Sequence, residues 1–134
     1  MDTVTPTIKG TISKSSDVIF RKLFYESKDL LLIFDFQEDK AVDVNESTLI
    51  FSGYSREEFM QLSRYDLTPK YSDFSPNIDL HKTYVDAHAK KVMNGESIVE
   101  LGIFKKKDGS EVYAELEIIP TGRKTGEAFI IIRL

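Results

Sequence analysis

Residues 52–59 read Ser-Gly-Tyr-Ser-Arg-Glu-Glu-Phe, a stretch that joins the end of one helix to the start of the next. Gly53 suits a left-handed helix C-cap, because it has no Cβ atom. Ser55 and Glu58 have the spacing of a capping box, in which each side chain accepts a hydrogen bond from the backbone amide of the other residue. The stretch therefore predicts one helix that ends at Gly53 and a second helix over about 56–62.

The residues before this stretch predict one helix and two strands. Residues 1–16, rich in Thr with one Pro and one Gly, are expected to form a linker. Residues 17–28 follow two serines and carry apolar side chains at helical spacing, so they predict a helix. The continuous apolar run 30–36 predicts a buried strand, and 41–44 predicts a second one. Asn45 is then expected to cap the helix that ends at the glycine.

The residues after it change from a helical to an extended pattern. Prolines and serines mark 64–78 as a loop, and a helix is expected over 79–93, closed by Asn-Gly. Beyond that point the pattern has a period of two, with turn signals between the segments. Three strands are expected, at about 97–105, 111–119 and 128–134. Strands divided by a helical insert indicate an antiparallel α+β fold.

Composition excludes several classes of protein. The chain has 134 residues, 41% of them hydrophobic, which suits one domain with a real core. Its net charge of −4 argues against a nucleic-acid-binding surface, and it has no apolar run long enough for a membrane span. It has no cysteine, so disulfides, thiolate nucleophiles and cysteine-based metal sites are excluded. No nucleophile–base arrangement is apparent, so catalytic residues are not predicted.

Several short motifs occur together in one order. They are Val44–Glu46 at a strand-to-helix junction, the stretch 52–59, Asp66–Pro69, the hairpin Lys106–Ser110, and Val112–Glu115 after it. In this order and spacing they resemble the PAS domain, over about residues 17–134. The family's last strand usually continues into an output helix, whereas this chain stops at Leu134. We therefore expect a single PAS domain over 17–134, cut from a longer signalling protein.

The resemblance implies both a fold and a role. It implies a five-stranded antiparallel sheet with short helices on one face and an N-terminal helix. It also implies a cytoplasmic regulatory sensor or dimerisation module, not itself an enzyme. Such a module passes the binding of a small-molecule ligand or partner to a downstream effector, as in two-component histidine kinases or cyclic-dinucleotide enzymes. A fold does not fix a function, so the site is argued separately.

The helix over 79–93 places both histidines of the chain on its apolar stripe. At 100° per residue, His81, Tyr84, Val85, His88 and Val92 fall on one side. The two histidines are seven residues apart, roughly 10 Å along the helix, which is too far to share one metal ion. Either they are partly buried core residues, or they face a ligand. The pocket candidates are these five residues together with Glu100, Leu116 and Ile118.

The sequence specifies no cofactor, and it is equally consistent with a domain that has none. Flavin sensors that form a cysteinyl adduct are excluded, because the chain has no cysteine. The alternative function is a haem-based gas or redox sensor, because His81 resembles the axial histidine of haem-binding PAS domains. Leu116 and Ile118 match positions that line that haem pocket. However, Glu100 stands where those sensors carry an arginine, and a carboxylate there repels the haem propionates.

The hairpin at residues 107–109 has two alternative registers. A two-residue Asp-Gly turn would place Val99 and Leu101 on the face of Leu116. A three-residue loop with Gly109 left-handed would instead place Glu100 on that face, toward the helices. The PAS resemblance favours the three-residue loop. A buried Glu100 would need a partner, either His88 or His81, and the pair would be sensitive to pH or bind a polar ligand. The alternative is a solvated glutamate at a bulge in the strand.

The same register turns apolar residues to the outer face of the sheet. Val99, Leu101, Ile103 and Ile119 would form a patch of a kind that rarely stays exposed on a monomer. Either the helix over 17–28 covers the patch as a lid, or a second subunit does. The sequence therefore also predicts a homodimer formed through the N-terminal helix and the outer sheet face.

Overall fold

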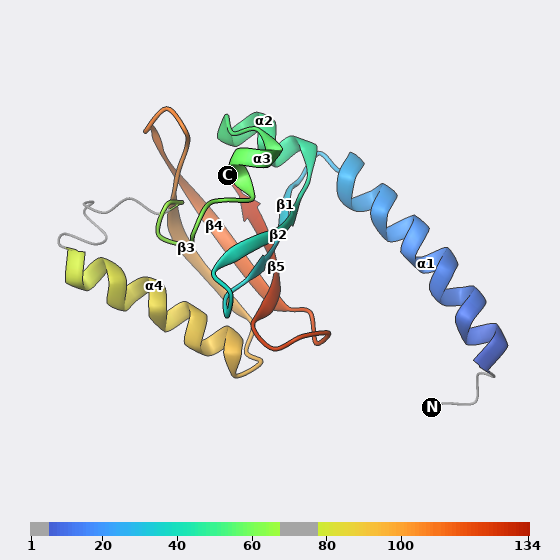
Figure 1. Cartoon of the computed structure of the whole chain (residues 1–134). Helices are drawn as coiled ribbons and strands as arrows, with labels where there is room; N and C mark the ends of the chain where they lie inside the picture. The colour runs from blue at the N-terminus through green and yellow to red at the C-terminus, as the bar shows by residue number, and fades with distance from the viewer. Residues whose placement is uncertain (1–5, 68–77) are drawn as a thin grey trace.

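A computed structural model of the chain describes residues 6–67 and 78–134, and it describes side chains over 16–67 and 86–134. Figure 1 shows a curved sheet with helices on one side and one long helix extending away from it. The elements in chain order are α1 (Pro6–Glu26), β1 (Leu30–Asp35), β2 (Lys40–Val44), α2 (Glu46–Ser52), α3 (Arg56–Phe59), α4 (Ile78–Met93), β3 (Ile98–Lys105), β4 (Glu111–Pro120) and β5 (Glu127–Arg133).

The five strands form one antiparallel sheet in the order β2-β1-β5-β4-β3. β1 and β5 are distant in the sequence and lie side by side in the centre, with Leu32 opposite Ile130. The helical insert α2–α4 connects the two halves of the sheet, which places the two hairpins on either side of the centre (Figure 1). The predicted α+β class and the five-stranded antiparallel sheet are confirmed.

The hydrophobic core lies between α2–α4 and one face of the sheet, here called the inner face. Alternate residues of each strand point into it, as the period of two requires. From the sheet they include Leu32, Phe34, Ile98, Phe104, Ala114, Ile118, Ala128 and Ile132, and from the helices Leu49, Phe59, Ala89 and Val92. The opposite face of the sheet, here called the outer face, meets α1 at one end.

The local helix signals of the sequence are confirmed atom by atom. The Asn45 side chain accepts a hydrogen bond from the Thr48 amide, and Gly53 has a φ of 84°. Ser55 and Glu58 form the complete capping box, with both side-chain-to-amide hydrogen bonds present. α3 is shorter than the expected 56–62, because Met60 already closes the last turn.

The start of the chain differs from the prediction. Residues 6–16 are helical rather than a linker, and α1 begins at Pro6, not at Asp17. Proline is favoured in the first turn of a helix, where its missing amide hydrogen is not needed. The expected cap at Ser15 and Ser16 is therefore wrong, and both serines lie inside the helix.

The hairpin between β3 and β4 has the predicted three-residue loop. The Lys106 amide donates to the Ser110 carbonyl at 2.9 Å, and Gly109 has a φ of 89°. Glu100 therefore pairs with Leu116 and shares its face, the inner face, as the prediction required. The two-residue alternative is excluded.

The hairpin tip also contacts the α2–α3 junction. The Lys107 amide donates to the Ser52 carbonyl at 2.9 Å, and the Lys107 ammonium lies 2.7 Å from Glu58. The two sequence motifs that predicted the fold, 52–59 and 106–110, thus meet in space. Another of the motifs, Asp66–Pro69, is described only in part, because residues 68 and 69 lie outside the described residues.

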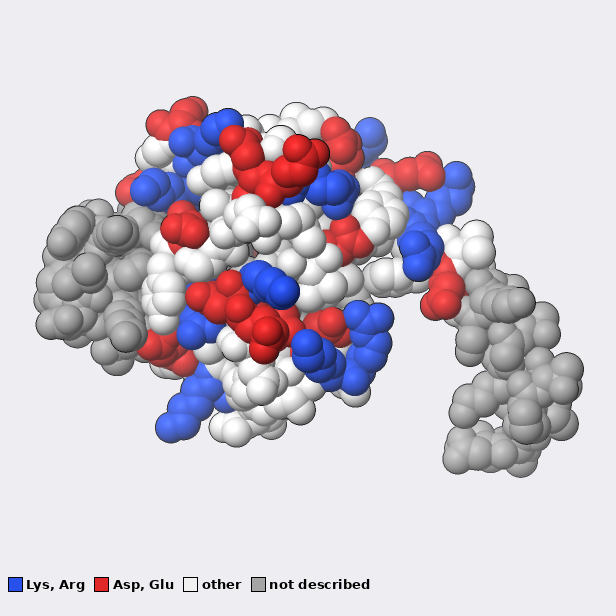
Figure 2. Space-filling model, viewed as in Figure 1, with Lys and Arg blue, Asp and Glu red and all other residues white. Residues whose placement is uncertain are grey.

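Charged side chains of both signs are distributed over the surface. On the face seen in Figure 2, Lys and Arg lie interspersed with Asp and Glu, so the described residues of this face form no separate basic patch. Within the described residues, no helix is long and apolar enough to cross a membrane. The same part of the chain contains no cluster of three or more His, Asp or Glu side chains that could hold a metal ion.

Two buried carboxylates lie opposite each other at one end of the sheet. Asp35 on β1 and Glu127 on β5 are only 2% and 3% exposed. Burial raises the pKa of Asp35, but hydrogen bonds from Lys124 and the amides of Glu38 and Gln37 outweigh it, and the net pKa is lowered. The hydrogen bond from Arg123 similarly lowers the pKa of Glu127, against the effect of burial. Both carboxylates therefore favour the folded state when ionised.

Acid is expected to destabilise the fold through this pair. Because both folded pKa values lie below the unfolded values of about 4, the stabilisation is complete above pH 4 and is lost as pH falls through the folded values. The urea midpoint should therefore drop between about pH 4 and pH 2. An Asp35→Asn/Glu127→Gln variant should be less stable at pH 7 and should show a flatter acid dependence. A double variant with the wild-type acid dependence would contradict this assignment.

Candidate functional site

A small cavity lies between the inner sheet face, α4 and the segment before residue 68. Its volume is about 90 Å³. Most of its walls are apolar side chains of β1, β3, β4 and β5, and two polar side chains, Arg64 and His88, reach it. The lining residues are Leu32, Phe34, Phe36, Arg64, Leu67, His88, Gly102, Ile103, Phe104, Leu116, Ile130 and Ile132.

A glycine at the middle of β3, Gly102, is among the residues that line the cavity. Gly102 faces inward and pairs with Ala114, so two small residues lie side by side on the inner face. A Cβ atom on Gly102 would lie 3.0 Å from Leu116 Cδ1, which is closer than ordinary contact. Glycine inside a strand often marks a place that another group approaches closely. Here the Leu116 side chain occupies the space that a side chain on Gly102 would take.

Glu100 and His88 form the polar pair that the sequence predicted. His88 Nε2 on α4 contacts Glu100 Oε1 on β3, and both side chains are largely buried. Burial lowers the pKa of His88, and the neighbouring Glu100 only partly opposes this effect. His88 is therefore mainly neutral at pH 7 and donates its Nε2–H to the carboxylate. The pair connects α4 to the edge strand of the sheet.

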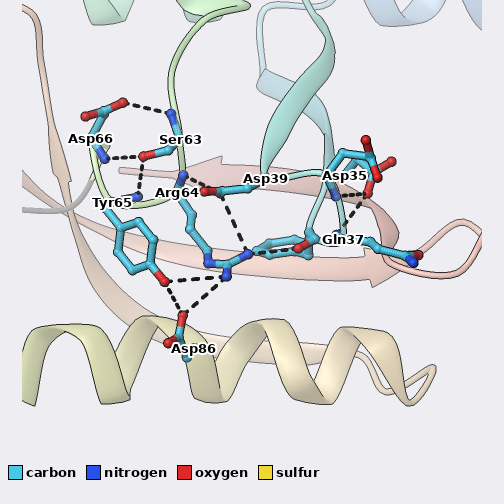
Figure 3. Close-up of polar contacts among 10 residues, drawn as sticks. Asp35, Gln37, Asp39, Ser63, Arg64, Tyr65, Asp66 and Asp86 are labelled. Atoms are coloured by element: carbon cyan, nitrogen blue, oxygen red, sulfur yellow. Dashed lines mark hydrogen bonds and ion pairs between the residues drawn. The ribbon is translucent and has the colours of Figure 1, made fainter.

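Arg64 also lines the cavity and connects three segments (Figure 3). Its guanidinium donates to the Phe36 carbonyl at 2.8 Å and lies 3.7 Å from Asp39, both in or next to the β1–β2 turn. It also lies 3.3 Å from Asp86 on α4, which accepts a hydrogen bond from the Tyr65 hydroxyl as well. Burial lowers the pKa of Arg64, but these partners outweigh it and the net pKa is raised. Arg64 therefore stays charged.

The predicted pocket residues fall into three groups. His88 and Leu116 line the cavity, and Glu100 contacts His88. Val92 and Ile118 do not line it; they are buried in the core cluster beside it. His81, Tyr84 and Val85 lie on α4, but their side chains are outside the described residues.

The sequence prediction missed Arg64 and the apolar wall from β1 and β5. Arg64 falls in a segment that the composition marks only as loop, and its three partners are 22 to 28 residues away along the chain. No local pattern indicates contacts of that range. Gly102 could have been found, because a glycine in the middle of an alternating strand is itself a signal.

The described walls do not fit a haem. Pockets for small molecules and cofactors usually measure about 300–1,000 Å³, whereas the described residues enclose about 90 Å³. The inward-facing Glu100 adds negative charge where haem propionates would need a cation. No step of the function is therefore assigned to haem.

A second, larger hollow lies on the outer face, between α1 and the sheet. Its volume is about 610 Å³, and its walls are mostly apolar. α1 contributes Ile19, Phe20, Leu23 and Phe24, and the sheet contributes Leu31, Ile119, Phe129 and Ile131. We call this hollow, defined by these eight residues, the outer groove.

α1 is attached to the domain only near its C-terminal end. Phe24 is buried, and the Phe20 ring packs edge-on against Phe129 with centroids 5.9 Å apart. Their sequence neighbours Ile19 and Leu23, in the same turns of the helix, remain 58% and 67% exposed. Figure 1 shows the rest of α1 extending away from the sheet. The helix therefore is not a complete lid over the outer face.

The outer face itself is only partly as expected. Val99 and Leu101 on β3 are exposed, as the register implied. Ile103, expected in the same exposed patch, is buried and lines the inner cavity. The segment before residue 68 adds to the sheet edge here, because the Lys105 amide donates to the Leu67 carbonyl at 2.9 Å.

A hydrogen-bonded group attaches α1 to the helical side of the domain. The Tyr25 hydroxyl donates to Asp43 on β2, and the Arg56 guanidinium, at the start of α3, donates to the same carboxylate at 2.9 Å. Arg56 also lies over the Tyr25 ring, 5.8 Å from its centroid. These contacts set the angle at which α1 leaves the domain.

This arrangement of sheet, helical insert and N-terminal helix is the PAS fold. No family model matches the chain, and no curated protein matches it in sequence. Its structure is similar to a domain of a sensory box sensor histidine kinase/response regulator from Geobacter sulfurreducens, with a TM-score of 0.70, 22% identity, and coverage of 92% of this chain and 96% of that one.

Two further structures are similar over nearly their whole length. One is the PAS domain of an HTR-like protein from Haloarcula marismortui, with a TM-score of 0.65, 17% identity, and coverage of 94% of this chain and 96% of that one. The other is a PAS domain from Colwellia psychrerythraea, with a TM-score of 0.66, 19% identity, and coverage of 91% and 95%. At these identities the likeness shows the fold, and the predicted PAS fold is confirmed.

Proposed function

We propose that the chain is a cytoplasmic regulatory sensor and dimerisation module of a signal-transduction protein such as a histidine kinase. It binds a small molecule in the inner cavity and relays that binding to an effector, and it does not itself catalyse a reaction. The similar domain from Geobacter sulfurreducens, part of a sensor histidine kinase/response regulator, supports this class of host protein.

One observation carries the proposal: the same strand lines both the inner cavity and the outer groove. On β5, Ile132 lines only the cavity, Phe129 and Ile131 line only the groove, and Ile130 between them lines both. Because side chains alternate along a strand, a shift of β5 that accommodates a ligand also moves the wall of the groove. A ligand in the cavity would shift the balance between two arrangements of the groove if its affinity for the protein differed between them.

The proposed occupant of the outer groove is α1 of a second copy of the chain. The exposed apolar side chains of α1 and the apolar walls of the groove belong to one surface, so two copies related by a two-fold axis would bury both at once. An exposed apolar surface of this kind is unfavourable on a monomer in water. The alternative sensor chemistry, haem binding, has no support among the described residues.

Dimerisation is expected to depend on α1. The chain should elute as a dimer in size-exclusion chromatography with light scattering, and an Ile19→Asp/Leu23→Asp variant should elute as a monomer, because it would bury two charges. Ile50→Asp on α2 is the matched control: Ile50 is 75% exposed and does not line the groove. A wild-type monomer at micromolar concentration, or a double variant that stays dimeric, would contradict the proposal. Native mass spectrometry of the purified chain would report the copy number and any retained ligand together.

A further inference from the structure

The inner cavity restricts the chemistry of what it can hold, and this inference rests on the proposed sensing function. We propose that the cavity binds a small, uncharged and largely apolar molecule, of about six non-hydrogen atoms or fewer. Such a molecule has at most one hydrogen-bonding group, as in a short-chain alcohol. The size of the cavity, the nature of its walls and the charged groups that reach it support this ligand class.

Size gives the upper limit. An apolar cavity of about 150 Å³ is known to take up benzene, and one water molecule accounts for about 30 Å³ of liquid. The inner cavity, at about 90 Å³, lies between these two values. It is therefore too small for a nucleotide or a flavin, and large enough for a chain of a few carbon atoms.

The walls give the polarity. Ten of the twelve lining residues are apolar or glycine, and those of β1 and β5 surround the space with hydrocarbon. Walls of this kind cannot replace the hydration of an ion, so a buried charge would be costly without a partner. A neutral apolar molecule loses little on entering and removes apolar surface from water.

The charged groups beside the cavity already bind acceptors or donors of the protein itself. Arg64 contacts the Phe36 carbonyl, Asp39 and Asp86. A carboxylate ligand would therefore compete with two protein carboxylates for the same guanidinium. These carboxylates also lower the potential beside Arg64, which opposes a third negative charge.

The His88–Glu100 pair disfavours a charged ligand of either sign. Glu100 repels an anionic ligand. A cationic ligand would have to compete with His88 for the Glu100 carboxylate. Among the described residues, the carboxylates of Asp39, Asp86 and Glu100 lie beside Arg64 and His88, and Lys91 acts on His88 from α4. Negative charge predominates among these described groups, which disfavours a carboxylate ligand most.

Three probes with the same four-carbon chain test the proposal. Butan-1-ol, butyrate and butylammonium would be titrated into the full chain, with binding followed by NMR of the isoleucine and leucine methyl groups of Leu116, Ile130 and Ile132. We expect saturable shifts with butan-1-ol and at least tenfold weaker binding of both charged probes. Equal or tighter binding of butyrate or butylammonium would overturn the ligand class.

Two variants change the cavity in opposite directions. Gly102→Ala adds a methyl group that would meet Leu116, so it should abolish the butan-1-ol shifts. Leu116→Ala enlarges the space and should strengthen the binding of hexan-1-ol at least tenfold. Val99→Ala, on the exposed face of the same strand, should bind butan-1-ol like the wild type. Binding of butan-1-ol that is unaffected by both Gly102→Ala and Leu116→Ala would place it outside the cavity and overturn the proposal.

The outcomes separate the ligand class from the sensing function. If a charged probe binds and Gly102→Ala abolishes its binding, the cavity is still a ligand site and only the ligand class is wrong. If no probe shifts the methyl groups in the wild type or in Leu116→Ala, both the ligand class and the sensing role of the cavity are wrong. The dimer experiment is independent of either result.

Discussion

Replacing Phe59 by alanine is expected to lower the free energy of unfolding by about 3–5 kcal/mol, the range typical of a fully buried phenylalanine. Phe59 is 0% exposed and belongs to the core cluster. Its ring also packs edge-on against Tyr54, with centroids 6.2 Å apart. Small domains have a total stability of about 5–15 kcal/mol, so this single change would remove a large part of it.

The effect should be large because Phe59 attaches α3 to the core, and α3 is too short to be stable as an isolated helix. α3 has only four residues, and so short a helix has little stability of its own in water. Urea denaturation followed by circular dichroism measures the change. Ile50→Ala on the neighbouring α2 is the control, because Ile50 is exposed and its loss should cost less than about 0.5 kcal/mol. Similar losses in the two variants would show that α3 is not anchored in this way.

Replacing Asn45 by alanine is expected to cost about 2–4 kcal/mol, more than an ordinary helix cap. Asn45 is 0% exposed. Its Oδ1 accepts from the Leu31 amide at 3.3 Å, from the Thr48 amide at 3.1 Å and from the Thr48 hydroxyl at 2.7 Å. Its Nδ2 donates to the Asp29 carbonyl at 2.8 Å. The substitution would leave several buried polar groups without a partner.

A second substitution at the same position separates the cap from the strand contact. Asn45→Asp keeps an oxygen that can accept from Leu31 and Thr48, but its carboxylate cannot donate to the Asp29 carbonyl. We expect a loss of stability at pH 7, because the charge is also buried. Thermal melts of the two variants and of the exposed Asn94→Ala give the comparison. An Asn45→Ala variant as stable as Asn94→Ala would refute the role assigned to Asn45.

The parts of the fold that the sequence predicted depend on contacts between near neighbours. The caps at Asn45 and Ser55 need only residues three positions away. The hairpin register follows from three loop residues, with Gly109 in the left-handed conformation. Such signals act within a few residues, so a single sequence is enough to find them.

The site was predicted only in part, because most of its contacts are long-range. The pairing of His88 with Glu100 was expected, since helical periodicity and strand register each placed one partner inward. The role of Arg64 was not predicted, because its contacts join a loop to a turn and to a helix. Nothing in the local sequence pattern specifies such contacts. The extent of α1 was also missed, because Pro6 starts the helix before the Thr- and Ser-rich residues that were taken for a linker.

The way α1 is attached makes it a lever. Its 21 residues extend about 30 Å at 1.5 Å per residue, and Tyr25, Asp43 and Arg56 hold it near one end. A tilt of about 10° at that fulcrum would displace the far end sideways by roughly 5 Å. A movement of β2 or α3 too small to disturb the core would therefore be amplified at the N-terminal end of α1.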